Sequence, residues 1–426
     1  MPPSPQNNPG IRPENGAGSN PAKRLVSRFT ERPHWRRELG IGAAAVVLAA
    51  GVALFLVAPR QDRLVSDHPI SKAGHRLVGV GFSDIPGFLE DDHAAALRTF
   101  LRSCAQGDND GGLANACLKA LAISDPSDPD TAEAFFTANF RPYRIEPEAG
   151  EGLVTAYYEP VVPGSRVRTE AFTEPLYALP PDFVRITDDN RPEGWDEELS
   201  WGRMSEAGLV PAPTRAEIDA GALEGRAEPI VYVADLIEAF YIHIQGSTRI
   251  ALPDGTMMRV GFAGKNGHPY SSVGKVMQAR GIVPSGGFSM DGMRAHFRED
   301  LDQARSLIHE NESYIFFREI RDLAPELGPI GGEGVPLTAG RSIAVDTAFH
   351  AYGTPVYIDS SPQIGPKAGG LRTAAPFRRL MIAQDTGSAI RGPARADLFW
   401  GTGPEAGSMA GGIKADGTFY VLLPKS

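Results

Sequence analysis

The sequence predicts a mainly β protein with helices, and two observations support that fold class. Short β-type runs bounded by Gly, Pro or Asp recur after residue 150, at 153–158, 229–233, 240–245, 257–262 and 314–317. Gly-Pro pairs then separate further short strands, at 328–329, 365–366, 392–393 and 403–404. Closely spaced strands joined by tight turns favour β-barrels over alternating strand–helix units.

Helical patterns precede and interrupt these runs. The stretch 68–121 is expected to be mostly helical, because acids at 91–92 precede apolar residues at helical spacing. A second helix is predicted to begin at Asp130 and to run to about Phe140. Two more are predicted inside the β-rich region, at 271–280 and 294–310.

Composition limits the classes of function. The chain has 426 residues, of which 42% are hydrophobic and 22% charged, so a sizeable core is expected. The net charge of −10 argues against a general nucleic-acid-binding role. The sequence contains no P-loop, no HExxH and no Cys/His cluster at zinc-ligand spacing. Neither a metal nor an organic cofactor is therefore implied.

The N-terminus predicts a membrane anchor. Residues 1–38 have the composition of a disordered tail. Residues 39–58 contain no charge, and twenty residues of helix span about 30 Å, the thickness of a bilayer core. Six basic residues lie between positions 23 and 37, just before this run, so the tail is expected in the cytoplasm and the remainder in the periplasm. A cleavable signal peptide is the alternative.

The sequence has two cysteines, Cys104 and Cys117. Outside the cytoplasm they are expected to form a disulfide that closes a short loop. In a cytosolic protein they would instead be two reduced, buried thiols.

Two carboxylates near the C-terminus are the strongest candidates for chemistry. The apolar run 381–383 delivers Asp385 at the end of a predicted strand, and Asp397 follows twelve residues later. Gly387 and Gly392 lie between them and allow a sharp turn. Glycosidic-bond cleavage requires two carboxylates brought together in this way. The alternative is that Asp385 caps a turn and Asp397 is a solvated loop residue.

At this point the chain resembles the membrane-bound lytic murein transglycosylase A family. Seven segments, in order, carry the resemblance. They are 155–160 (TAYYEP), 244–247 (IQGS), 264–270 (GKNGHPY), 311–317 (NESYIFF), 334–342 (GVPLTAGRS), 352–356 (YGTPV) and the region of Asp385 and Asp397.

The resemblance implies a double-psi β-barrel domain with an inserted second β-rich domain, behind an N-terminal transmembrane helix. Residues 59–155 are expected to be the helical N-terminal part of the barrel domain. The inserted substrate-binding domain is expected at 156–310, and the catalytic barrel at 311–426.

The resemblance also implies an activity, namely cleavage of the MurNAc-β-1,4-GlcNAc bond of peptidoglycan with formation of 1,6-anhydromuramic ends. Asp397 matches the catalytic acid, which first protonates the glycosidic oxygen and then takes the proton of the attacking C6 hydroxyl. Asp385 matches a second acidic position, which stabilises positive charge or orients its loop. An inverting hydrolase with Asp385 as base, or a non-catalytic wall-binding protein, are the alternatives.

Five residues of the motif segments and one further acid are predicted to bind the glycan. They are Tyr157, Tyr158, Gln245, Ser247, Tyr270 and Asp346. The alternative for the tyrosines is ordinary strand core. Peptidoglycan glycan strands are the expected partner, the membrane is contacted through the anchor, and cell-wall synthesis or division proteins are candidate partners.

Overall fold

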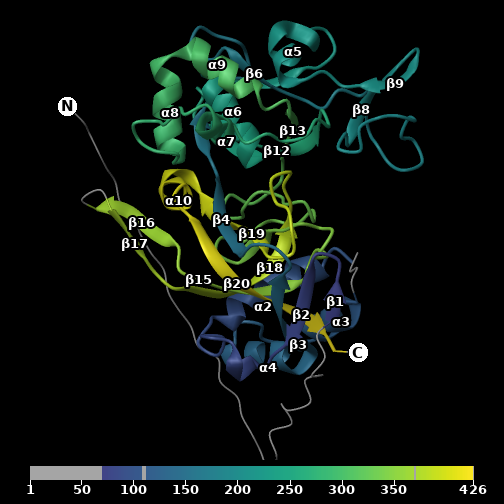
Figure 1. Ribbon diagram of the computed structural model, residues 1–426, viewed down its shortest axis with the longest axis vertical. Coiled ribbons are helices and arrows are strands. Elements are labelled where there is room, and N and C mark those ends of the chain that lie inside the picture. Colours follow the sequence, from purple (N-terminus) through teal and green to yellow (C-terminus); the bar gives the residue numbers. More distant parts are fainter. Residues whose placement is uncertain (1–69, 108–111, 369–370, 426) are drawn as a thin grey trace, which may run out of the picture. The chain divides into compact units, whose positions relative to one another are not determined.

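The computed structural model describes residues 70–107, 112–368 and 371–425. The predicted tail and anchor, at 1–38 and 39–58, lie outside these residues. In the part of the chain that is described, no helix is both long and apolar enough to span a bilayer. The described residues are mainly β with helices, as expected (Figure 1).

Six strands close into a ring at the centre of one sheet. They are β4 (Gly152–Glu159), β14 (Ser342–Ala344), β15 (Pro355–Ser360), β18 (Phe377–Asp385), β19 (Arg395–Thr402) and β20 (Lys414–Pro424). Their pairing order is β20-β15-β18-β14-β19-β4, and β4 pairs again with β20, which completes the ring. The pairs β14–β18 and β19–β4 are parallel, and the other four are antiparallel. Figure 1 shows β4 (teal) beside β19 and β20 (yellow), although they are far apart in the sequence.

The apolar faces of these strands form a core that includes Val154, Ile343, Met381, Leu398 and Val421, each at most 3% exposed. Helix α10 (Gly403–Ala410) follows β19 directly. The hairpin of β16 (Gln363–Ala368) and β17 (Leu371–Ala374) connects β15 to β18.

The sheet extends beyond β20 through three N-terminal strands. They are β1 (Ile70–Lys72), β2 (His75–Gly79) and β3 (Phe140–Pro147). The expectation that 68–121 is mostly helical is therefore wrong for residues 70–79. Gly74, with a φ of 80°, turns the chain between β1 and β2. Pairing of β2 with β3, more than sixty residues away, stabilises a strand that local pattern does not predict.

Helices α2 (His93–Cys104), α3 (Ala114–Leu121) and α4 (Pro129–Asn139) pack together beside this extension, after the short 3-10 helix η2 (Phe82–Asp84). A disulfide joins Cys104 and Cys117, the pair named from the sequence, and links α2 to α3. A bidentate ion pair between Arg341 and Asp91, with both N–O distances 2.8 Å, attaches the segment before α2 to the residue preceding β14. The helical layer is thus held to the ring by side chains.

The residues between β4 and β14 form a second group of strands and helices. Its sheets are β13-β12-β11-β5, β10-β6 and β7-β8-β9. The strands are β5 (Val161–Pro163), β6 (Glu174–Tyr177), β7 (Phe183–Arg185), β8 (Trp201–Ser205), β9 (Gly208–Pro211), β10 (Pro229–Val233), β11 (Ser247–Ala251), β12 (Met257–Lys265) and β13 (Ile315–Glu319). The helices are α5 (Arg215–Glu217), η3 (Ile218–Ala222), α6 (Leu236–Gln245), α7 (Val273–Ala279), α8 (Met290–Glu299) and α9 (Leu301–His309).

One predicted strand is a helix. Residues 240–245 were expected to be β, yet they form the second half of α6. Asp235 caps this helix by accepting a hydrogen bond from the Glu238 amide, and Gly246 ends it with a φ of 79°. A helix buried on most sides reads as a continuous apolar run, which periodicity does not distinguish from a buried strand. The capping residues Asp235 and Gly246 were the sequence features that indicated a helix.

The second group ends later than residue 310. Strand β13 at 315–319 pairs with β12, so it belongs with the inserted strands and not with the ring.

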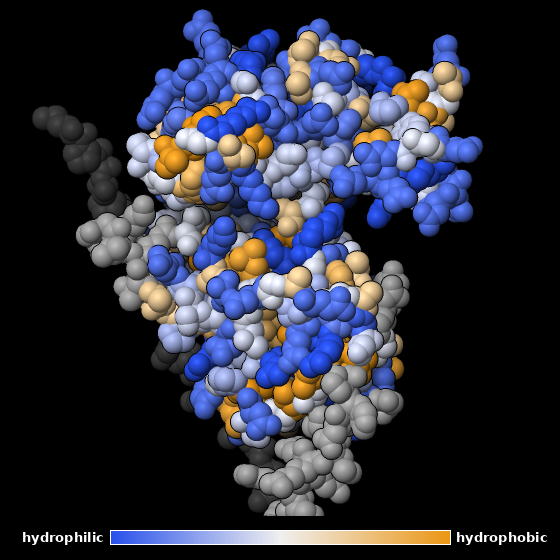
Figure 2. Space-filling view, viewed as in Figure 1, coloured by the Kyte–Doolittle hydropathy of each residue, from blue (hydrophilic) through white to orange (hydrophobic). Residues whose placement is uncertain are grey.

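Figure 2 shows a face of the described residues on which hydrophilic side chains predominate between smaller hydrophobic patches.

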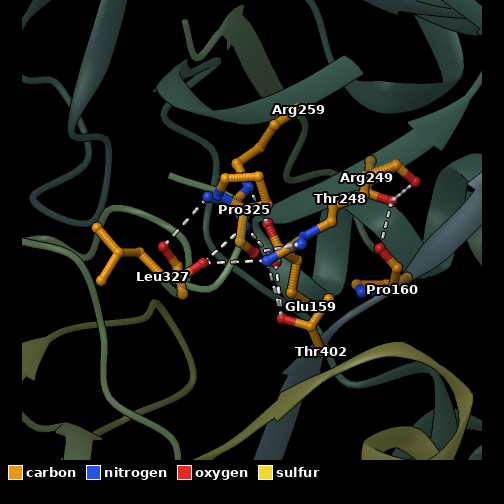
Figure 3. Close-up of polar contacts among 9 residues, drawn as sticks. Glu159, Pro160, Thr248, Arg249, Arg259, Pro325, Leu327 and Thr402 are labelled. Carbon is orange, nitrogen blue, oxygen red and sulfur yellow. Dashed lines mark hydrogen bonds and ion pairs between the residues drawn. The ribbon is translucent and has the colours of Figure 1, made fainter. Parts of the chain in front are cut away.

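A buried ion cluster joins the inserted strands to the ring (Figure 3). Glu159, at the end of β4, is fully buried and binds Arg249 of β11 and Arg259 of β12, with N–O distances of 2.8 and 2.9 Å. The Thr402 hydroxyl, at the end of β19, also donates to Glu159. Both arginines donate to the carbonyl oxygen of Leu327, on the segment that returns to the ring. Through these two arginines, the Glu159 carboxylate links the end of β4, where the chain leaves the ring, to the segment at Leu327, where it returns.

A buried amide supports the end of β18. Gln384 is fully buried, accepts a hydrogen bond from the Ser342 hydroxyl and donates to Ser103 of α2. The Ser103 hydroxyl in turn donates to Glu333, at 2.8 Å. Burial raises the pKa of Glu333 to about 7, and the hydrogen bond from Ser103 opposes that rise. The residue before Asp385 is therefore fixed on both sides.

We expect Glu159→Gln to lower the free energy of unfolding by about 3 kcal/mol, because two buried guanidinium groups lose their counter-charge. Glu146→Gln is the control, since it removes one carboxylate from two arginines, Arg76 and Arg144, that are partly exposed. That change should cost less than about 1 kcal/mol. Urea denaturation of the full chain measures both, and equal losses would contradict the role given to the cluster.

Glu333 should make stability depend on pH. Its pKa is about 7 in the fold against an ordinary value of 4.5, so its stabilising contribution is complete below about 4.5 and is lost as pH rises through 7. Between pH 5 and 8 the wild type should lose on the order of 1 kcal/mol relative to Glu333→Gln. Denaturation at the two pH values measures this difference. The exposed control Glu151→Gln should retain the wild-type dependence, and parallel curves for wild type and Glu333→Gln would refute the prediction.

Candidate active site

The two acids lie on either side of one residue. Ala344 of β14 pairs with Asp385 of β18 on one edge and with Asp397 of β19 on the other. Thr155 of β4 pairs with Asp397 in turn, so four neighbouring strands contribute to one row. Two strand spacings separate the Cα atoms of the acids by roughly 10 Å. Strand register, and not the loop between them, therefore brings the two carboxylates together.

Asp397 accepts a hydrogen bond from one side chain, that of Thr155. Arg395 donates to the Thr155 hydroxyl oxygen at 2.8 Å. A guanidinium only donates, so the single hydroxyl proton of Thr155 points to Asp397 Oδ1, at 2.5 Å. Among the described residues, Oδ2 of Asp397 has no hydrogen-bond partner. One oxygen is thus committed as an acceptor and the other is available to a ligand.

Burial raises the pKa of Asp397, while the positive charge of Arg395 and the hydrogen bond from Thr155 act against that rise. The neutral form of this carboxyl is favoured relative to a solvated aspartate. A general acid that works near neutral pH needs such a shift.

Asp385 accepts three hydrogen bonds. The Tyr157 hydroxyl donates to Oδ2 at 2.5 Å, and the amides of Gly332 and Thr386 donate to Oδ1 at 2.8 and 2.9 Å. Burial raises the pKa of Asp385, the three donors lower it, and the negative charge of Asp397 raises it further. Three donors stabilise the charged form more than the single donor at Asp397 does. Asp397 has one donor and the positive charge of Arg395 instead, so the two carboxyls differ in their surroundings.

Tyr157 crosses from β4 towards β18 to reach Asp385. Its ring packs against Phe399 at a centroid distance of 5.5 Å and lies in one buried cluster with Ala344. The small side chain of Ala344, between the two acids, leaves room for the ring. Burial raises the pKa of Tyr157 well above its ordinary value, and Asp385 adds to that rise. Tyr157 therefore stays a hydrogen-bond donor.

A glycine-rich segment closes over Asp385. A Cβ atom at Gly332 would lie 2.5 Å from the Tyr352 hydroxyl, so only glycine fits beside that ring. Burial and, to a lesser extent, the negative charges of Asp385 and Glu333 raise the pKa of Tyr352 to about 12.

The sequence motifs did not point to Thr155, Arg395, Gly332 or Tyr352 as site residues. Thr155 lies two residues before Tyr157 in a predicted strand, and this period of two was the available signal.

The other predicted glycan-binding residues are distributed differently. The Tyr158 amide donates to Gln245 Oε1 at 3.0 Å, and the Tyr158 ring packs on Gly407 of α10. Tyr158, Gln245 and Ser247 are all buried, at 6–8% exposure. Tyr270 is half-buried, and the charge of Asp397 is a minor contribution to its raised pKa, after burial. Gln245 thus contacts the end of β4, and Ser247 begins β11, where it pairs with Gly261 of β12. A contact of these residues with the glycan stays a prediction.

Asp346 organises the loop that precedes β19. It is 7% exposed, and its carboxylate accepts hydrogen bonds from the amides of Ala348 and Gly392, at 3.1 and 2.8 Å. Both donors are backbone groups, which is typical of a loop anchor. A contact of Asp346 with substrate stays a prediction. In the described part of the chain, no group of three or more His, Cys, Asp or Glu side chains could hold a metal ion.

Comparison with known families gives two matches. The MltA specific insert domain matches residues 153–318, and the 3D domain matches residues 341–423. Among curated proteins, membrane-bound lytic murein transglycosylase A of Escherichia coli K12 is 32% identical over 296 residues, which cover 67% of this chain and 71% of that protein. The Vibrio cholerae protein of the same name is 31% identical over 276 residues, covering 64% and 66%.

Solved structures agree with these matches. The membrane-bound lytic murein transglycosylase of Agrobacterium tumefaciens has a TM-score of 0.72 and 35% identity, covering 82% of this chain and 97% of its own. MltA of Neisseria gonorrhoeae has a TM-score of 0.69 and 33% identity, covering 84% and 94%. Escherichia coli MltA with bound chitohexaose has a TM-score of 0.59 and 25% identity, covering 85% and 97%. The chain therefore belongs to the membrane-bound lytic murein transglycosylase A family.

Proposed function

We infer that the chain is a lytic murein transglycosylase, the activity named for its curated relatives. It cleaves the MurNAc-β-1,4-GlcNAc bond of peptidoglycan and leaves 1,6-anhydromuramic ends. One observation supports the site assignment most directly. Asp397 and Asp385 flank Ala344 on adjacent strands, and one donor contacts the first acid while three contact the second.

We propose that Asp397 performs both proton transfers. In its neutral form it carries the proton on Oδ2, because Oδ1 accepts from Thr155. It donates this proton to the glycosidic oxygen as that bond breaks, and positive charge develops on the muramic sugar. The resulting carboxylate then takes the proton of the C6 hydroxyl, whose oxygen bonds to C1. Attack from within the sugar avoids the entropy cost of positioning a water molecule.

In this proposal Asp385 remains charged throughout. Its carboxylate lies on the far side of Ala344 from Asp397, and its three donors hold it in one orientation. A fixed negative charge stabilises the oxocarbenium-like state without forming a bond to it. Tyr157 acts as a positioning residue, because it contacts Asp385 and not the reacting atoms.

The finer architecture is proposed on the same basis. We propose that the closed ring of six strands is a double-psi β-barrel, and that the insert begins near residue 156, as expected, but extends through β13 at 315–319 instead of ending at 310. The relatives are named membrane-bound, which supports membrane association in a Gram-negative bacterium. The anchor at 39–58 and a periplasmic catalytic part remain proposals from the sequence.

The substrate is proposed to be a glycan strand. A structure of a relative, Escherichia coli MltA, contains bound chitohexaose, a polymer of N-acetylglucosamine. Tyr270 is half-buried, so part of its side chain is accessible to a ligand, and we propose that it binds the glycan. Cell-wall synthesis or division proteins remain candidate partners.

Asp397→Asn should abolish release of anhydro products, because the amide keeps the shape but neither donates an acidic proton nor accepts one back. A loss of about a thousandfold or more is expected, within the range for general acid–base catalysis. Mass spectrometry of muropeptides released from sacculi measures it, with Asp359→Asn as a control for an acid paired to Arg378. Wild-type products one water heavier, with reducible ends, would instead identify a hydrolase.

Removing a donor from each acid should shift opposite limbs of the pH profile. Tyr157→Phe deletes a hydrogen bond that lowers the pKa of Asp385, so the acid limb of kcat/KM should move to higher pH. Thr155→Val deletes one that lowers the pKa of Asp397, so the alkaline limb should move to higher pH. Each shift is expected to be about one pH unit. Profiles that move on the same limb would refute the assignment of acid and anion.

A further inference from the structure

Three basic residues lie on neighbouring segments beside the site, and none of them has a carboxylate partner among the described residues. Lys265 ends β12, Arg185 ends β7, and Arg391 lies in the segment between β18 and β19. We call these three residues the basic cluster. They come from the inserted strands and from the ring, and neither the sequence analysis nor the mechanism above assigns them a role.

Contacts among neighbouring residues bring their chain segments together. Lys265 Nζ lies 3.4 Å from the Ser388 hydroxyl, three residues before Arg391. Arg185 pairs with Trp201 across β7 and β8. The Trp201 ring packs on the residue before Lys265, because a Cβ atom at Gly264 would lie 3.2 Å from Cη2 of that ring. The ends of β7 and β12 therefore lie side by side, next to the loop after β18.

No described carboxylate forms an ion pair with any of the three. Arg185 and Arg391 are exposed, and Lys265 is half-buried. Burial lowers the pKa of Lys265, and the positive charges of Arg391 and Arg185 lower it further. The chain as a whole carries a net charge of −10, so abundant acids are available elsewhere. A cluster of unpaired cations in an acidic protein is a binding surface for an anion.

The basic cluster lies close to the candidate catalytic acids. Ser388, which contacts Lys265, follows Asp385 by three residues. The charge of Arg185 acts on the Tyr352 phenol, and so does that of Asp385. An anion bound here would therefore belong to a part of the substrate close to the bond that is cleaved.

We propose that the basic cluster binds a carboxylate carried by the muramic acid residue of the glycan strand. The proposal rests on the function inferred above and specifies its substrate class: an acid-bearing strand, and not a neutral polymer of N-acetylglucosamine. Two sources supply this chemistry, namely the lactyl carboxylate of a peptide-free muramic acid and the carboxylates of its peptide stem. Ammonium and guanidinium groups hold either through charge-assisted hydrogen bonds.

Binding to three ligands tests the proposal. The full chain, solubilised in detergent and carrying Asp397→Asn to prevent turnover, is titrated with a peptide-bearing muropeptide dimer, the same dimer stripped of peptide by an amidase, and chitohexaose. Lys265→Met, Arg391→Gln and Arg185→Gln are each added to this background. Arg166→Gln is the matched control, because it removes an inserted-strand arginine that pairs with Glu319 instead.

Each cluster variant should weaken binding of the acid-bearing ligand about tenfold and leave chitohexaose binding unchanged. A loss on the stripped dimer alone assigns the lactyl carboxylate, which is an uncharged amide in the peptide-bearing dimer. A loss on the peptide-bearing dimer alone assigns the stem, and a loss on both dimers shows that the cluster binds either carboxylate. Equal losses on chitohexaose, or no loss on any ligand, would overturn the proposal. Its failure is distinct from failure of the proposed function, which is judged by anhydro products from the enzyme with Asp397 intact.

Discussion

The structure of the candidate site depends on the register of one short strand. Ala344 of β14 pairs with Asp385 on one side and Asp397 on the other, and Thr155 extends the row to β4. Side chains along a strand alternate between faces, so a slip of one residue would turn one acid away from the other. Closure of the six-stranded ring through β4 and β20 restrains such a slip, because every strand in it has two neighbours.

Within that row, hydrogen-bond direction separates the roles of two chemically identical groups. The Arg395 guanidinium can only donate hydrogen bonds, so the Thr155 hydroxyl accepts from it and donates its own hydrogen bond to Asp397 Oδ1. Asp385 receives a phenol and two backbone amides. Burial favours the neutral form of both carboxyls, and the number of donors then separates their tendencies to ionise. These different surroundings support the proposed roles of Asp397 as the acid and Asp385 as the anion.

The inserted strands are joined to the ring by two kinds of charge arrangement. In the buried cluster between the ring and the inserted strands, Glu159 forms ion pairs with Arg249 and Arg259. The protein itself therefore neutralises part of the positive charge there. Within the described ranges, no carboxylate forms an ion pair with Lys265, Arg185 or Arg391. The first arrangement holds the two parts of the chain, and the second leaves charge available for a ligand. The paired arginines are therefore structural, whereas the basic cluster is proposed to bind a ligand.

The sequence by itself determined the mainly β class with helices, the family, the pair of acids and the two cysteines. These features are local: alternating apolar runs, Gly-Pro turns and short motifs in order. It did not determine that 240–245 is helical or that 70–79 forms strands, because a short apolar run is compatible with either state until its caps or partners are known. The sequence also did not show that the Tyr158 amide donates a hydrogen bond to Gln245, and the binding of the glycan by these two residues stays a prediction. Only the tertiary structure decided strand register, the donors at each acid and the meeting of three cations, because those contacts join residues tens to hundreds of positions apart in the chain.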